Sequence, residues 1–128
     1  MDSLIIGLNH VAIAAQDFER SVRFYTDTLG FPTEKTFDLP HRGMKIVFVR
    51  AGNASIEIFG YTEGPIEPPP PTGERQAGMR HIALLVDDVE ETYKKLKKRG
   101  VEFVREPRRG LATFKDPDGI VIELTEWL

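Results

Sequence analysis

The sequence contains an internal repeat, and this repeat constrains the fold more strongly than any other feature of the chain. His10 in the first half corresponds to His81 in the second half, and each stands in a predicted first strand. Near the end of each half, Ile56-Glu57-Ile58 corresponds to Ile122-Glu123-Leu124 in the predicted last strand. We therefore expect two copies of one folding unit.

Each half shows the signals of a strand, a helix and then three strands. In the first half, Leu8–Ala14 alternates as a strand does, Asp17 is a candidate helix N-cap, and Gly30 ends the helical spacing. Asp88 and Gly100 have the same two roles in the second half. Two such units can join into one curved arrangement of mixed sheet with the helices outside, which is an α+β fold.

We expect the 128 residues to form a single domain made of two modules, 7–61 and 78–128. Residues 62–77 separate the modules and include Pro65-Ile66-Glu67-Pro68-Pro69-Pro70-Pro71. Such a run lacks backbone donors and is held near polyproline geometry, so it cannot be a helix or a central strand. We interpret it as a stiff linker.

The composition excludes several classes of function. A net charge of −3 argues against a nucleic-acid-binding face, which usually needs a clustered basic surplus. The chain has no cysteine, which excludes thiolate metal sites and a cysteine nucleophile and fits a cytoplasmic protein. The N-terminal residues do not resemble a signal peptide, and no stretch approaches the ~20 apolar residues of a membrane helix. We therefore expect no membrane and no nucleic-acid partner.

The duplicated histidine and glutamate are the main functional signal. A carboxylate among branched aliphatics is costly unless it is paired, hydrogen-bonded or bound to a cation. Because the first and last strands of a unit can be neighbours, each unit offers one imidazole and one carboxylate to the same face. Taken singly, each residue is more often a structural histidine or a solvent-facing glutamate. Their equivalence across the repeat favours a metal site made of His10, Glu57, His81 and Glu123.

Two imidazoles and two carboxylates suit one borderline divalent ion, such as Zn²⁺, Ni²⁺, Co²⁺, Fe²⁺ or Mn²⁺. Calcium is disfavoured because it prefers cages made of oxygen alone. We expect no organic cofactor.

Five stretches of the chain match a known superfamily; they are Leu8–Ile13, Ser21–Phe31, Ile56–Phe59, Arg80–Ala83 and Asp116–Leu124. With these stretches the chain resembles the vicinal oxygen chelate superfamily, the glyoxalase/bleomycin-resistance/extradiol-dioxygenase group. The resemblance implies a pair of βαβββ modules around a central metal cavity. It also implies a homodimer, with the metal site within one chain or shared across two.

Within that superfamily, the order His, Glu, His, Glu resembles glyoxalase I. The resemblance implies a metal-dependent lyase or isomerase of lactoylglutathione lyase type, which chelates its substrate through adjacent oxygens. A metal-bound glutamate then moves a proton between neighbouring carbons through an enediolate. We expect Glu123 to be this base, with Glu57 as its near-symmetric counterpart. The expected partner is a small-molecule substrate such as a thiol or CoA conjugate.

The sequence departs from bacterial glyoxalase I at Ala14, where those enzymes typically carry an arginine for the glutathione carboxylate. Arg105, Arg108 and Arg109 could instead bind an anionic tail, or they could form a solvated rim.

Other members of the superfamily are alternatives: an epimerase, an extradiol dioxygenase, or a non-enzymatic small-molecule-binding and resistance protein. A fourth ligand counts against the dioxygenase, which needs open metal positions. Retention of all four ligands counts against the non-enzymatic protein.

Overall fold

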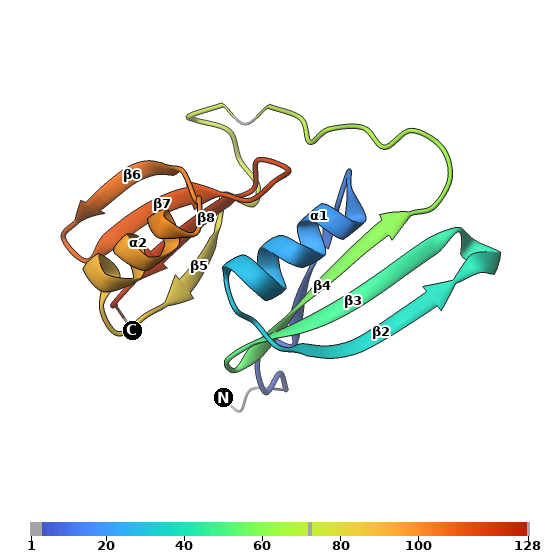
Figure 1. Ribbon diagram of the computed structural model, residues 1–128, viewed down its shortest axis with the longest axis horizontal. Helices are drawn as coiled ribbons and strands as arrows, with labels where there is room; N and C mark the ends of the chain where they lie inside the picture. Colours follow the sequence, from blue (N-terminus) through green and yellow to red (C-terminus); the bar gives the residue numbers. More distant parts are fainter. Residues whose placement is uncertain (1–3, 72, 128) are drawn as a thin grey trace. The chain divides into compact units, whose positions relative to one another are not determined.

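The computed structural model describes residues 4–71 and 73–127, whose strands form two four-stranded sheets (Figure 1). One compact unit ends at Ile66 and the other begins at Glu67, except that Asp27–Leu29 group with the second. Each unit has one strand, one helix and three further strands, so the predicted α+β class and the two βαβββ modules are confirmed. The limits predicted for the modules and for the linker stay predictions.

The first unit contains a mixed sheet in the order β1-β4-β3-β2, in which β1 is parallel to β4 and the other pairs are antiparallel. Its elements are β1 (His10–Ala14), α1 (Phe18–Arg23), a π-helical turn η1 (Phe24–Thr28), β2 (Thr33–Leu39), a 3₁₀ turn η2 (Pro40–Arg42), β3 (Met44–Ala51) and β4 (Ala54–Tyr61). This order makes the first and last strands neighbours, so His10 and Glu57 lie on adjacent strands.

The helix of the first unit begins where the sequence predicts and changes form earlier than expected. Asp17 caps it, because a side-chain oxygen of Asp17 accepts a hydrogen bond from the backbone of Arg20 at 3.1 Å. The helical spacing predicts a helix reaching Leu29, but the regular α-helix ends at Arg23 and η1 follows. Thr26 Oγ1 donates to the Val22 carbonyl at 2.7 Å, and such back-bonding competes with the regular backbone ladder.

The core of the first unit lies between α1 and one face of the sheet. Ile13, Ile56 and Ile58 are buried on that face. Helix and sheet approach closely at Gly60, where an added Cβ would lie 2.7 Å from the Cβ of Phe18. A side chain at this position would push the helix away, so glycine is needed for the packing.

The second unit repeats the topology in the order β5-β8-β7-β6, with β5 parallel to β8. Its elements are β5 (Ile82–Leu85), α2 (Val89–Lys98), β6 (Phe103–Arg108), β7 (Leu111–Lys115) and β8 (Val121–Thr125). Asp88 caps α2 by accepting a hydrogen bond from the backbone of Glu91 at 3.1 Å, as the capping pattern predicts. The prediction that His81 stands within the first strand of its module is wrong, because β5 begins only at Ile82 and His81 directly precedes it.

Apolar residues of β7, β8 and α2 form the second core, with Phe114, Ile122 and Leu124 almost completely buried. The turn that begins at Asp116 is held by two hydrogen bonds, since its Oδ1 accepts from the backbone of Asp118 at 2.9 Å and of Ile120 at 2.8 Å. No helix in the described part of the chain is long and apolar enough to cross a membrane.

Candidate functional site

The first unit brings His10 and Glu57 to one face of its sheet. In the parallel pair of β1 and β4, His10 lies opposite Ser55 and Ala12 lies opposite Glu57. Residues that lie opposite each other on paired strands share one face of the sheet, and so do alternate residues along one strand. His10 and Glu57 therefore occupy the same face, one pleat apart on adjacent strands.

The second unit repeats this register. Ala83 lies opposite Glu123 in the parallel pair of β5 and β8, and His81 stands two residues before Ala83. The His81 Nε2 atom is 3.7 Å from Glu123 Oε2. The two side chains are 41% and 25% exposed, so solvent and small molecules can reach both of them.

Neither glutamate lies in a core. The neighbours Ile56 and Ile58 of Glu57, and Ile122 and Leu124 of Glu123, fill the cores, while the glutamates point to the other face and are half-buried. The predicted alternation of a glutamate with buried aliphatic residues is confirmed in both strands. Because both carboxylates are only half-buried, their desolvation costs less free energy than the sequence suggested. A partly exposed carboxylate can both bind a cation and meet a substrate.

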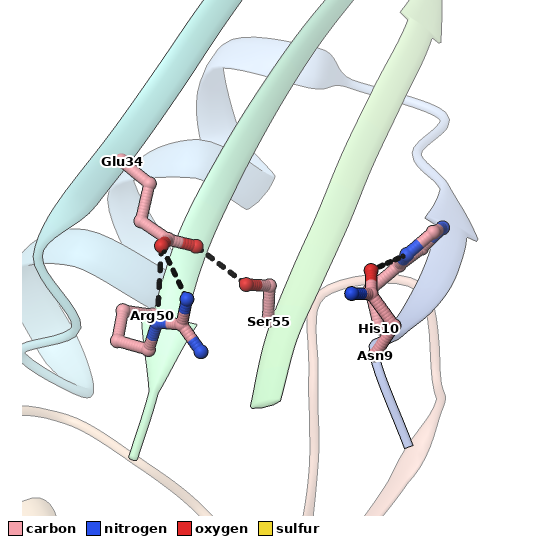
Figure 2. Close-up of polar contacts among 5 residues, drawn as sticks. All are labelled: Asn9, His10, Glu34, Arg50 and Ser55. Carbon is pink, nitrogen blue, oxygen red and sulfur yellow. Dashed lines mark hydrogen bonds and ion pairs between the residues drawn. The ribbon is translucent and has the colours of Figure 1, made fainter. Parts of the chain in front are cut away.

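The histidine of the first unit is oriented by its neighbours. Figure 2 shows the contact between Asn9 and His10. Asn9 Oδ1 lies 2.6 Å from His10 Nδ1. Because an amide oxygen can only accept, the proton of a neutral ring belongs on Nδ1 and the lone pair on Nε2. The Phe48 ring packs against the imidazole with centroids 5.6 Å apart in a T-shaped contact. The Nε2 atom is therefore the one prepared to bind a metal.

Beside His10, three polar residues link β2, β3 and β4 (Figure 2). Ser55 Oγ donates to one oxygen of Glu34 at 2.5 Å, and the Arg50 guanidinium forms an ion pair with the other at 2.7 Å. The hydrogen bond from Ser55, followed by the bond and charge of Arg50, holds the pKa of Glu34 below its ordinary value against an opposing desolvation effect. This cluster was missed by sequence reasoning, because Glu34 lies 16 residues from Arg50 and 21 residues from Ser55 without a local motif.

The second unit has an open groove of about 740 Å³ on the side that carries Glu123. Arg105, Arg108, Arg109 and Trp127 also line it. The sequence suggested that these arginines bind an anionic tail or form a solvated rim, and the structure places them beside a candidate catalytic carboxylate.

The donors present in each unit fit a borderline divalent ion, since each unit supplies one imidazole nitrogen and one carboxylate on a common face. Among the residues that the structure describes, no three His, Asp or Glu side chains form a metal-binding group. The structure thus brings the predicted ligands together as two pairs, His10 with Glu57 and His81 with Glu123. Ligation of one ion by all four stays a prediction.

Known proteins resemble this chain over nearly its whole length. The family model of the Glyoxalase/Bleomycin resistance protein/Dioxygenase superfamily matches residues 7–124. The mitochondrial methylmalonyl-CoA epimerase of Mus musculus is 30% identical over 133 residues, which cover 93% of this chain and 72% of the relative. The lactoylglutathione lyase of Escherichia coli O157:H7 is 33% identical over 129 residues, covering 93% and 91%.

A solved structure shows the same likeness in three dimensions. The trypanothione-dependent glyoxalase I of Leishmania major superposes with a TM-score of 0.74 at 29% sequence identity. The match covers 91% of this chain and 83% of that protein.

Proposed function

The chain belongs to the glyoxalase/bleomycin resistance/dioxygenase superfamily, and from this premise we propose that it is a divalent-metal-dependent lyase or isomerase of glyoxalase I type. Its relatives include a lyase and an epimerase, which supports an enzymatic role. The proposed substrate is a small molecule with two adjacent oxygens, carried on a thiol or CoA conjugate. We also propose that the protein is a homodimer.

The observation that carries this proposal is the duplicated register of the two parallel strand pairs. In each unit a histidine stands two residues before the strand partner of a glutamate, on the face away from the core. The repeated topology fixes the spacing of these positions but not their residue types, so the recurrence of histidine and glutamate at both supports a shared role. We propose His10, Glu57, His81 and Glu123 as ligands of one ion of Ni²⁺, Zn²⁺, Co²⁺, Fe²⁺ or Mn²⁺.

A bound divalent cation would stabilise negative charge on adjacent substrate oxygens. The proton is moved by the chain itself. Glu123 takes it from a carbon next to a carbonyl and returns it, which requires a carboxylate within reach of the substrate. The groove beside Glu123 supports this choice. Glu57 faces Phe48 across β4 and β3, an apolar neighbour, and is proposed as the counterpart that stays a ligand.

Epimerisation is a second candidate, supported by the methylmalonyl-CoA epimerase relative and by the arginines in the groove. Both reactions begin with removal of a proton next to a carbonyl. They differ in the carbon that receives the proton: the same carbon in epimerisation and the neighbouring carbon in the lyase or isomerase reaction.

One pair of assays tests both candidates on the same preparation. The purified protein, loaded with each of the five metals in turn, is given methylglyoxal with glutathione or another thiol, and separately one stereoisomer of methylmalonyl-CoA in D₂O. Formation of the 2-hydroxyacyl thioester supports the glyoxalase I type. Deuterium incorporation with inversion supports epimerisation. Inactivity in both assays after metal loading would contradict the proposed reaction class.

A further inference from the structure

We propose that the groove of the second unit is a phosphate-binding subsite for the tail of the substrate, with Arg105, Arg108 and Arg109 holding the phosphate oxygens. This inference rests on the proposed function, because the tail would belong to the substrate on which Glu123 acts. The binding itself is independent of catalysis and can be measured separately.

An irregularity in β6 places two arginines on the face of the candidate base. Arg105 lies opposite Thr113 and Arg108 lies opposite Leu111, with the register shifting between them. Thr113 and Leu111 are two residues apart and share a face, whereas residues three apart on a regular strand would not. The bulge therefore brings both arginines to one side. Thr113 in turn lies opposite Glu123, so the arginines and the candidate base occupy one surface.

The three arginines are available to a ligand. Within the described residues, none of them takes part in an ion pair or a side-chain hydrogen bond. All three are exposed at the rim of the groove. Arg50 of the first unit differs, because its charge is already matched by Glu34. The groove lining also contains Glu106 and Glu123, so the three guanidinium charges still exceed the carboxylates.

The backbone conformation of Arg109 also supports a binding role. Its φ of 55° makes it the one non-glycine residue with positive φ among the described residues. Glycine, asparagine or aspartate usually takes this place in a tight hairpin turn, because other side chains are strained there. An arginine kept in a strained conformation at the mouth of a basic groove is consistent with a binding role.

The chemistry and size of the groove favour a phosphate-bearing tail. Guanidinium groups bind phosphate through paired hydrogen bonds, and three of them match a multiply charged group better than a single carboxylate. A volume of about 740 Å³ lies within the usual range for small-molecule sites. Trp127 is 64% exposed and lies against the hairpin turn, since a Cβ on Gly110 would be 2.9 Å from its Nε1. Its indole offers a flat surface for a ring attached to the phosphate.

The experiment uses the fluorescence of Trp127, the single tryptophan of the chain, and calorimetry as a second readout. The full-length protein is titrated with ADP, inorganic pyrophosphate and glutathione, with and without bound metal. We expect ADP and pyrophosphate to bind and to change the fluorescence. Tighter binding of ADP assigns a nucleotide tail, and equal binding of both assigns a simple phosphate ester; each outcome supports the subsite.

Matched variants test whether these arginines themselves, and not the overall charge of the protein, account for the binding. Arg105→Gln combined with Arg108→Gln should weaken ADP binding at least about tenfold. Arg109→Gly should weaken it too while raising or preserving the unfolding temperature, because glycine relieves the positive φ. Arg23→Gln, which removes an exposed arginine of α1 in the other unit, should leave binding unchanged.

Three results would overturn the subsite: no binding of ADP or pyrophosphate at millimolar concentration, tighter binding of glutathione than of both, or binding that the arginine variants leave unchanged. Failure of the proposed function would look different. Phosphate binding would then persist in metal-free protein and in Glu57→Gln, while the turnover assays stayed negative.

Discussion

The Nε2 atom of His81 lies 3.7 Å from Oε2 of Glu123, and both side chains face away from the core of the second unit. The same spacing along the strands places His10 beside Glu57 in the first unit. Each pair combines an imidazole nitrogen with a carboxyl oxygen on the face away from the core. The roles of the four residues can therefore be separated by substitution.

Glu123→Gln should lower kcat on the substrate identified by the turnover assays by at least about 100-fold, because an amide cannot take a proton from carbon. Glu57→Gln should act mainly through weaker metal affinity, so that excess metal restores much of its activity. Glu102→Gln, an exposed position of the same unit, serves as the control and should leave kcat unchanged. Equal rescue of both glutamate variants by metal would contradict the assignment of Glu123 as base.

Glu34→Gln should lower the unfolding temperature at neutral pH, because it removes the charge that Ser55 and Arg50 stabilise. The pKa of Glu34 is lower in the folded protein than in the unfolded chain, so its contribution is present above the ordinary carboxyl range. It is lost as the pH falls through the lowered value.

Thermal unfolding at several pH values measures this dependence. The wild-type protein and Glu34→Gln should differ at pH 7 and converge in acid. A difference that grows as the pH falls would show that the cluster acts through something other than this carboxylate.

Gly60→Ala should destabilise the first unit by about 1–3 kcal/mol, because the new Cβ would lie 2.7 Å from the Cβ of Phe18 and force α1 from the sheet. Denaturant unfolding gives the free energy directly. Gly7→Ala is the matched control, since its added Cβ meets nothing within 4 Å. Equal stability of both variants would mean that α1 does not pack on β4 as closely as the structure shows.

Much of the fold could be predicted from the sequence because its signals are local or repeated. The caps at Asp17 and Asp88 use a side chain and a backbone group three residues away. The turn at Asp116 is equally local. That the first and last strands of a unit can be neighbours was an expectation, and the parallel pairs β1–β4 and β5–β8 confirm it.

Other features depend on contacts that no local pattern records. The register shift that places Arg105 and Arg108 on the same face of the sheet is set by the pairing of β6 with β7. The hydrogen bond between Ser55 and Glu34 joins β4 to β2, which are separated in the sheet by β3. The late start of β5 at Ile82 was also missed. Met79 and His81 continue the strand-like alternation of the residues that follow, but the pairing of β5 with β8 begins only at Ile82.

Metal content is the most direct test of the central proposal that the two His–Glu pairs hold one divalent ion. Elemental analysis of protein purified without chelators and then loaded should give one ion per chain. His10→Ala with Glu57→Ala should abolish it, and so should His81→Ala with Glu123→Ala, because either pair alone is too weak a site. His41→Ala, which removes the remaining histidine, should leave one ion per chain. Retention of about half the metal in each double variant, or none in the wild-type protein after loading, would contradict the proposal.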